Sequence, residues 1–251
     1  MQCTVLKIKD LELIPDIRTR WNSTYMMMNR ALYLREPLHY MASADNELKI
    51  YLLSDEDWNR IQEVESLMEC FQTATLAMSE ANHPTLCQTI PIYNYLLDII
   101  EDFIDQKKPS EDVVIAANNA KEKLLRYYPT SDGLVYIIST ILDPKNKMEY
   151  YHENGFDDYI EIYKKQITEL WKKNYMPAQI TINPPNTSNV LVNHIYKKRK
   201  FVQSDELDNY LNSPPANIET NTLLYWKVVK IYIINCTYLL LLNTINELII
   251  D

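Results

Sequence analysis

Apolar residues recur every three to four positions along most of the chain, which is the spacing of one face of an α-helix. The pattern predicts helices over about residues 24–38, 54–78, 85–104, 110–128 and 157–174. Ser54 is followed three residues later by Asp57, which predicts a capping box in which Asp replaces the usual Glu. The sequence therefore predicts a mainly α-helical protein.

Three further segments need separate interpretations. Ser23 or Thr24 is expected to cap the first helix, which places Arg20 and Trp21 just before its N-terminus. The short apolar run over residues 134–142 fits a helix or a strand by periodicity alone. Residues 176–203 contain several prolines among Asn, Ser and Thr and show no periodicity, so we expect a disordered linker there.

Composition supports helices and restricts the way in which the chain could bind DNA. Only two glycines and 47% hydrophobic residues occur in 251 positions, which disfavours a fold built from many short strands and tight turns. The formal net charge is −9, whereas nonspecific DNA affinity comes mostly from Lys and Arg that neutralise phosphates. Any contact with DNA must therefore be local.

Cysteine and histidine spacing gives no sign of a metal centre or a disulfide framework. The four cysteines are scattered without a C-x-x-C pair, and we expect reduced, mostly buried thiols. The four histidines lack the i, i+4 pairing with a second ligand that is typical of a metal site. No secretory signal peptide is recognisable, which favours an intracellular protein. We expect no metal and no cofactor.

Several short blocks occur in a fixed order along the chain. They are Thr19-Arg20-Trp21-Asn22-Ser23-Thr24-Tyr25, Ser54-Asp55-Glu56-Asp57-Trp58, Pro84-Thr85-Leu86, Pro91-Ile92-Tyr93-Asn94 and Ile141-Leu142-Asp143-Pro144-Lys145. This ordered set resembles the hAT-family transposases, particularly the zinc finger BED domain-containing RICESLEEPER group. Residues 205–211 and 224–227 look like the opening of the hAT C-terminal dimerisation region, so the resemblance covers roughly residues 10–227.

The resemblance implies a domain organisation. Residues 1–175 correspond to a helical domain that matches the hAT insertion and the adjoining RNase H-like region, which favours a helix over residues 134–142. Residues 176–203 are the linker, and residues 204–251 are a truncated dimerisation-like segment with a divergent helical tail. We interpret the tail after Lys227 as sequence unrelated to the family, acquired by truncation or a shifted reading frame.

Arg20 and Trp21 are the candidate DNA-binding residues. A tryptophan ring can stack on an unpaired base, and an adjacent arginine can hold a phosphate. In hAT transposases the matching tryptophan is thought to steady DNA at the hairpin-forming step. The alternative is structural: Trp21 anchors the core ahead of a helix, and Arg20 caps the helix or pairs with Asp16.

The resemblance also implies that the chain does not cut DNA. The family has two catalytic aspartates upstream of the Arg-Trp pair and a glutamate downstream, and no position here matches them. Asp98, Glu101, Asp102 and Asp105 form an acidic stripe that we interpret as a solvated helix face. Asp143 precedes Pro144, a pair that commonly begins a turn, and we interpret it as structural.

Function at this stage is a choice between two classes. The chain is expected to be a catalytically inactive, transposase-derived fragment with residual DNA binding; the alternative is a helical interaction module that pairs with a second copy or a related transposase and does not bind DNA. The basic cluster Lys197-Lys198-Arg199-Lys200 is a candidate nuclear import signal or phosphate contact. The apolar tail over residues 231–242 falls short of a bilayer span, so we expect no membrane partner. We also expect no small-molecule partner.

Overall fold

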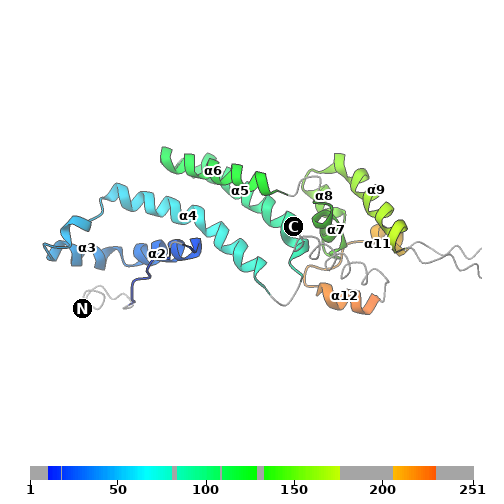
Figure 1. The fold of residues 1–251 in the computed structure, drawn as a ribbon, viewed down its shortest axis with the longest axis horizontal. Coiled ribbons are helices and arrows are strands. Elements are labelled where there is room, and N and C mark those ends of the chain that lie inside the picture. Colours follow the sequence, from blue (N-terminus) through cyan, green and yellow to red (C-terminus); the bar gives the residue numbers. More distant parts are fainter. Residues whose placement is uncertain are drawn as a thin grey trace, which may run out of the picture. The chain divides into compact units, whose positions relative to one another are not determined.

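The computed structural model describes residues 11–17, 19–80, 84–107, 109–128, 133–175 and 206–229. Every regular element in these ranges is a helix, as Figure 1 shows, which confirms the mainly α fold class. The chain divides into two compact units, which are residues 1–81 with 88–130 (unit 1) and residues 82–87 with 131–251 (unit 2). The predicted linker, the basic cluster at residues 197–200 and the tail from residue 230 onward lie outside the described residues.

Unit 1 begins with two helices where the sequence predicts one. Helix α2 spans Trp21–Tyr33 and helix α3 spans Arg35–Ala44, with a break at Leu34. Pro37 explains the break, because proline has no amide hydrogen to bond the carbonyl one turn earlier and its ring clashes with that carbonyl. In α3 the proline lies in the first turn, where its missing amide costs nothing.

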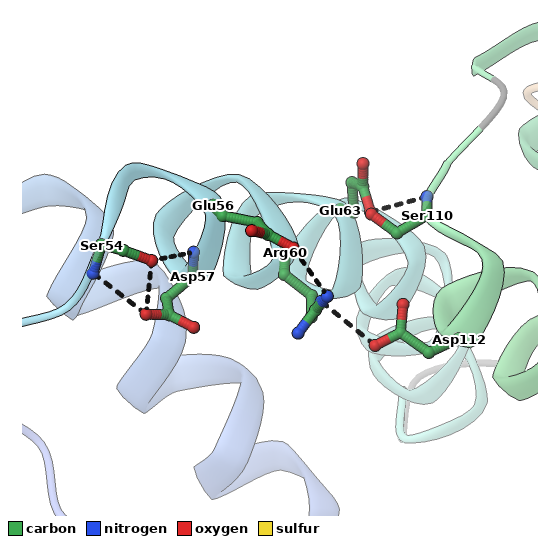
Figure 2. A network of polar contacts seen from close by, with 7 residues as sticks. All are labelled: Ser54, Glu56, Asp57, Arg60, Glu63, Ser110 and Asp112. Atoms are coloured by element: carbon green, nitrogen blue, oxygen red, sulfur yellow. Dashed lines mark hydrogen bonds and ion pairs between the residues drawn. The ribbon is translucent and has the colours of Figure 1, made fainter.

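Helix α4 (Asp55–Met78) begins with the predicted capping box, which is confirmed. The Asp57 amide donates to Ser54 Oγ at 3.1 Å, and the Ser54 amide donates to Asp57 Oδ2 at 3.0 Å (Figure 2). These two bonds satisfy amides that a helix N-terminus otherwise leaves free. A short 3-10 helix, η1 (Lys49–Tyr51), precedes α4 in the loop from α3.

Helices α5 (Thr89–Lys107) and α6 (Glu111–Tyr127) complete unit 1. Pro91 lies in the first turn of α5, where proline is tolerated, and the helix continues through it. The helices bury a core whose members are Leu67, Ile100, Phe103, Val113 and Ala117, with Cys70, Ala74 and Leu96 beside it. Polar contacts also join α4 to the start of α6 (Figure 2): Glu63 Oε2 accepts from the Ser110 amide at 3.0 Å, and Arg60 Nε lies 3.1 Å from Asp112 Oδ2.

Unit 2 contains helices α7 (Leu134–Leu142), α8 (Glu149–Glu153), α9 (Asp157–Asn174), α11 (Glu206–Asn212) and α12 (Thr222–Val229). The open choice for residues 134–142 is thus settled as a helix. The buried core residues are Ile138, Ile141, Leu142, Tyr151, Ile160, Ile167, Trp171, Leu207, Tyr210 and Trp226. Gly155 has φ of +78°, a conformation that favours glycine, and it lets the chain turn from α8 into α9.

The segment from Ile141 to Lys147, which we call the α7 turn, holds α11 and α12 through hydrogen bonds. Tyr210 Oη donates to the Ile141 carbonyl at 2.8 Å, and Trp226 Nε1 donates to the Leu142 carbonyl at 3.1 Å. The carbonyls at the end of α7 have no partner within the helix, so these side chains satisfy groups that would otherwise be buried unpaired. Asp143 lies in this turn and is 3% exposed, in line with its structural interpretation.

Candidate nucleic-acid interface

The chain that leads into α2 is folded back on the first turn of the helix. Asp16 Oδ1 accepts hydrogen bonds from Ser23 Oγ at 2.9 Å and from Thr24 Oγ1 at 2.8 Å, and the Ile17 amide donates to Ser23 Oγ at 2.7 Å. The predicted cap at Ser23 or Thr24 is therefore wrong: both residues lie inside α2, and their hydroxyls hold the preceding loop. Arg20 takes the N-cap position, without a side-chain capping bond.

Trp21 is the first residue of α2 and is 41% exposed. Its ring meets Phe71 of α4 in an edge-to-face contact, with centroids 6.3 Å apart and ring planes at 71°. Helix α2 runs antiparallel to α4, because Trp21 lies against Phe71 while Asn29 Nδ2 donates to Glu65 Oε1 at 2.8 Å. The tryptophan is thus fixed on one side by an aromatic contact and remains accessible in part.

Arg20 is exposed, and its backbone is extended, with φ of −134° and ψ of 101°. Its guanidinium forms no hydrogen bond or ion pair with any residue that the structure describes. The alternative in which Arg20 pairs with Asp16 is not the observed arrangement, since the Asp16 carboxylate accepts from Ser23 and Thr24. The structure therefore places an available arginine directly beside a half-exposed tryptophan.

The charge around this pair is mixed. Residues 1–35 contain six Lys or Arg and three Asp or Glu, against the acidic balance of the whole chain. The α4 side of the neighbourhood is acidic, because Glu65 and Glu69 lie there. Burial raises the pKa of Tyr25, and these two carboxylates add to the effect. A phosphate group would therefore be disfavoured along the α2–α4 interface.

The residues of the predicted acidic stripe on α5, Asp98, Glu101, Asp102 and Asp105, are all exposed. Glu101 forms an ion pair of 2.6 Å with Lys121 of α6. Within the described ranges no three His, Cys, Asp or Glu side chains come together in a way that could hold a metal ion. His152 pairs instead with Asp157 at 2.5 Å on the surface of unit 2.

Two features of the structure were not found from the sequence. Phe71, the aromatic partner of Trp21, was visible only as one apolar position among several on the predicted helix, since periodicity does not say which helices pair. An apolar cavity lined partly by α3 and η1 was not foreseen either. The run of apolar residues from Ile50 to Leu53 was the available signal, because such a run is unusual in a connecting loop.

None of the helices in the described parts of the chain is long and apolar enough to cross a bilayer.

Comparison with known proteins places the candidate interface in a recognised domain. The family model of the ZBED1 RNase-like helical domain matches residues 2–67, which include Arg20, Trp21 and the capping box. No solved structure matches the chain.

Three curated relatives show the same relationship over longer segments. A putative transcriptional regulator, tpeD, of Talaromyces stipitatus is 28% identical over 240 residues, or 88% of this chain and 26% of the relative. The putative AC transposase of Zea mays is 24% identical over 238 residues, covering 85% of this chain and 29% of the relative. Zinc finger BED domain-containing protein 4 of Homo sapiens is 24% identical over 148 residues, covering 59% and 12%.

The chain thus spans less than a third of the length of each of these relatives. The part that it spans contains the ordered sequence blocks, and their helices occupy both units of the structure. The comparisons indicate the same family as those blocks, since they match a ZBED1 helical domain, a maize transposase and a zinc finger BED protein. The chain thus resembles hAT-family transposases over the part that it spans.

Proposed function

We propose that this transposase-derived protein binds DNA through Arg20 and Trp21, with a preference for unpaired or splayed ends. The observation that carries the proposal is the pairing of a 41% exposed Trp21 with an arginine that has no partner among the described residues. An accessible indole offers a stacking surface to a base, and a neighbouring guanidinium can bind the adjacent phosphate in a bidentate manner.

The loop geometry supports this proposal because it holds the backbone at Arg20 and the ring of Trp21 in place before DNA arrives. The bonds from Ser23 and Thr24 to Asp16 hold the loop against α2, and Phe71 limits the rotation of Trp21. A fixed aromatic side chain loses little conformational entropy on binding. The overall acidity of the chain means that the affinity is local in origin and weak at physiological salt.

The test is binding of the purified protein to splayed-end, hairpin and fully paired DNA over a series of salt concentrations. Trp21→Ala is expected to remove the preference for unpaired ends, at a cost of roughly 1–3 kcal/mol or about five- to 150-fold in affinity. Arg20→Ala is expected to weaken binding to all three DNAs and to lower the salt slope by about 1.

Tyr33→Ala is the matched control, since Tyr33 is 51% exposed at the other end of the same helix. This variant should bind like the unchanged protein. Absence of binding even at low salt, or equal binding by Trp21→Ala, would reject the proposal.

We further propose that the chain does not cut DNA. The support is the family resemblance, in which the positions of the catalytic carboxylates have no counterpart among these 251 residues. Phosphodiester cleavage by such enzymes depends on carboxylate-bound metal ions that stabilise the attacking and leaving oxygens. Mg²⁺-dependent nicking of a labelled hairpin by the purified protein would contradict this proposal.

A nuclear location is a further proposal, supported by the transposase and BED zinc finger relatives. The candidate signal is the basic cluster Lys197-Lys198-Arg199-Lys200. A fluorescent fusion in which these four residues are changed to Ala should lose nuclear enrichment. The same fusion with Lys164 and Lys165 of α9 changed to Ala is the control for loss of positive charge alone.

The second candidate function is a dimerisation module, and the exposed face of α12 favours it. Leu223, Leu224 and Val228 are 49%, 58% and 78% exposed on an eight-residue helix. An uncovered apolar face of this kind commonly marks a protein contact. A stable dimer that is dissociated by Leu224→Asp and has no DNA affinity would favour this function over the first.

A further inference from the structure

A second apolar surface lies in unit 1, away from the Arg20–Trp21 pair in sequence. It contains a cavity of about 190 Å³ between the end of α2, helix α3, the loop with η1, and the start of α4. The lining residues are Ala31, Leu38, His39, Met41, Ala42, Leu48, Tyr51, Leu52, Leu53 and Trp58. An apolar cavity of about 150 Å³ in another protein binds benzene, so this one can accept a branched aliphatic side chain.

The rim of the cavity carries large apolar side chains that remain in solvent. Ile50 is 78% exposed and Tyr51 is 70% exposed, and the neighbouring Tyr40, Met41, Leu52 and Leu53 are 37 to 51% exposed. We call residues 38–53 the α3–η1 surface; Figure 1 shows α3 and the chain that leads from it into α4. Contiguous exposed apolar residues around a concavity are typical of a protein-binding site.

The shape of this surface suits a copy of itself. Ile50 projects next to cavity-lining residues without lining the cavity itself, so a protruding side chain and a recess occur side by side on one patch. In a two-fold dimer the same patch is used by both subunits, and each supplies the part that the other lacks. Ile50 of each copy can then enter the cavity of the other.

The charges beside Ile50 fit the same arrangement. Glu47 and Lys49 flank Leu48 in the loop, are both exposed, and form no ion pair with any other residue in the described ranges. Because Glu47 and Lys49 lie on either side of Leu48, a two-fold axis that passed near Leu48 would bring Lys49 of one copy opposite Glu47 of the other. Opposite charges that meet across the rim favour this pairing and fix its register.

The available area is sufficient for a small stable contact. Six apolar side chains exposed by 37 to 78% offer on the order of 600–700 Å² per copy, close to the roughly 800 Å² per partner of a standard interface. The polar rim residues add to this area. The surface is thus of the right size for a homodimer without any contribution from α12.

We propose that the α3–η1 surface is a homodimer interface in which Ile50 of each copy fills the cavity of the other. This goes beyond the DNA-binding proposal, and it is separate from the dimerisation expected at α12. The two surfaces predict different effects of mutation, so they can be tested independently.

The experiment is sedimentation equilibrium of the full 251-residue protein at several concentrations. The unchanged protein is expected to form dimers, and Ile50→Asp is expected to raise the dimer dissociation constant at least tenfold by placing a charge in an apolar cavity. Ile50 is mostly exposed in one copy, so the substitution should leave the fold intact; an unchanged helical circular dichroism spectrum checks this.

Charge exchange provides the second readout. Lys49→Glu should weaken the dimer by placing two carboxylates opposite each other, and the double variant Glu47→Lys with Lys49→Glu should restore it. Ile115→Asp on α6, where Ile115 is 56% exposed, is the matched control and should have no effect.

Two results would overturn the proposal. One is a protein that is monomeric at all concentrations, which would leave the surface to a different partner. The other is a dimer that survives Ile50→Asp and dissociates with Leu224→Asp, which would place the contact on α12. Neither result affects the DNA-binding test, because Ile50 lies outside the loop that holds Arg20 and Trp21.

Discussion

Lys147 and Tyr210 are joined by two contacts in the interior of unit 2. Lys147 Nζ donates to the Tyr210 carbonyl at 2.8 Å, and the same nitrogen lies 4.3 Å from the centroid of the Tyr210 ring. The nitrogen also donates to the carbonyl and the hydroxyl of Ser213, at 2.9 and 2.6 Å. A buried ammonium therefore binds carbonyls at the C-terminal end of α11. The C-terminal end of a helix favours positive charge.

Replacing Lys147 by Met should destabilise unit 2. The change keeps most of the apolar stem but removes the donor to the Ser213 carbonyl and one of the donors to the Tyr210 carbonyl, which still accepts from Ser213 Oγ, at a cost of roughly 1–3 kcal/mol in the free energy of unfolding. Urea denaturation followed by circular dichroism measures this. Lys165→Met on the exposed face of α9 is the control and should change the value by less than about 0.5 kcal/mol. Equal stability of both variants would show that the buried amine contributes little.

Asp143 and Thr222 should be energetically coupled across 79 residues of sequence. Thr222 Oγ1 lies 3.2 Å from Asp143 Oδ1, and both residues are buried. A double-mutant cycle with Asp143→Asn and Thr222→Val should give a coupling energy of about 0.5–3 kcal/mol, as for other residues in contact. Additive effects would mean that α12 is held by its apolar contacts and the Trp226 bond alone.

Ser54→Ala should cost about 1 kcal/mol of stability by removing the cap of α4. Thr73→Ala, at an exposed position in the middle of the same helix, should be neutral or slightly stabilising.

Hydrogen bonds from Ser54 lower the pKa of Asp57. Their contribution is therefore present above the ordinary Asp pKa and is lost as pH falls through the lowered value, so Ser54→Ala should also reduce the acid sensitivity of α4 in a pH series.

Unit 2 should lose stability in alkali because Cys87 must stay protonated. Burial and the nearby Asp143 carboxylate raise the pKa of the Cys87 thiol to about 12. The folded state then holds this proton more tightly than the unfolded chain, so its contribution is complete below pH 8.5 and declines as pH rises toward 12.

The decline due to Cys87 should reach about 2 kcal/mol between pH 8 and 10 and should be absent in Cys87→Ala. Tyr210, whose pKa burial also raises, acts in the same direction but only above pH 10. Burial lowers the pKa of Lys147, so this group acts in the opposite direction: its contribution to stability rises as pH rises from the lowered pKa to the ordinary Lys value. Parallel curves of stability against pH for the unchanged protein and Cys87→Ala would contradict the Cys87 assignment.

Local signals predicted most of the helices correctly. The capping box at Ser54 and Asp57 fixed the start of α4, and apolar spacing gave the extent of α6 and α9 to within a few residues. The first predicted helix failed at Leu34 because a proline three residues later outweighed continuous apolar spacing. Ser23 and Thr24 were misassigned because a hydroxyl in the first turn can bond the preceding loop as easily as its own helix.

Long-range partners were not predictable from one sequence. Arg20 and Trp21 were recognised from their motif, but Phe71 became their neighbour only through the pairing of α2 with α4. Lys147 was just one more lysine in the sequence, although it is 2% exposed and has φ of +49°. Periodicity reports which face of a helix is buried, and it carries no information on which carbonyl a distant side chain will reach.

The α7 turn has a consequence for synthesis on the ribosome. Trp226 follows Leu142 by 84 residues, so at about 5–20 residues per second its indole emerges roughly 4–17 seconds after the carbonyl that it binds. During that interval the end of α7 lacks its final partners, and its apolar side chains are open to chaperones or to other nascent chains. The last residue of unit 1 is translated about 100 residues before Trp226, so unit 1 can fold first. Unit 2 is therefore the part that stays incomplete for longer during synthesis.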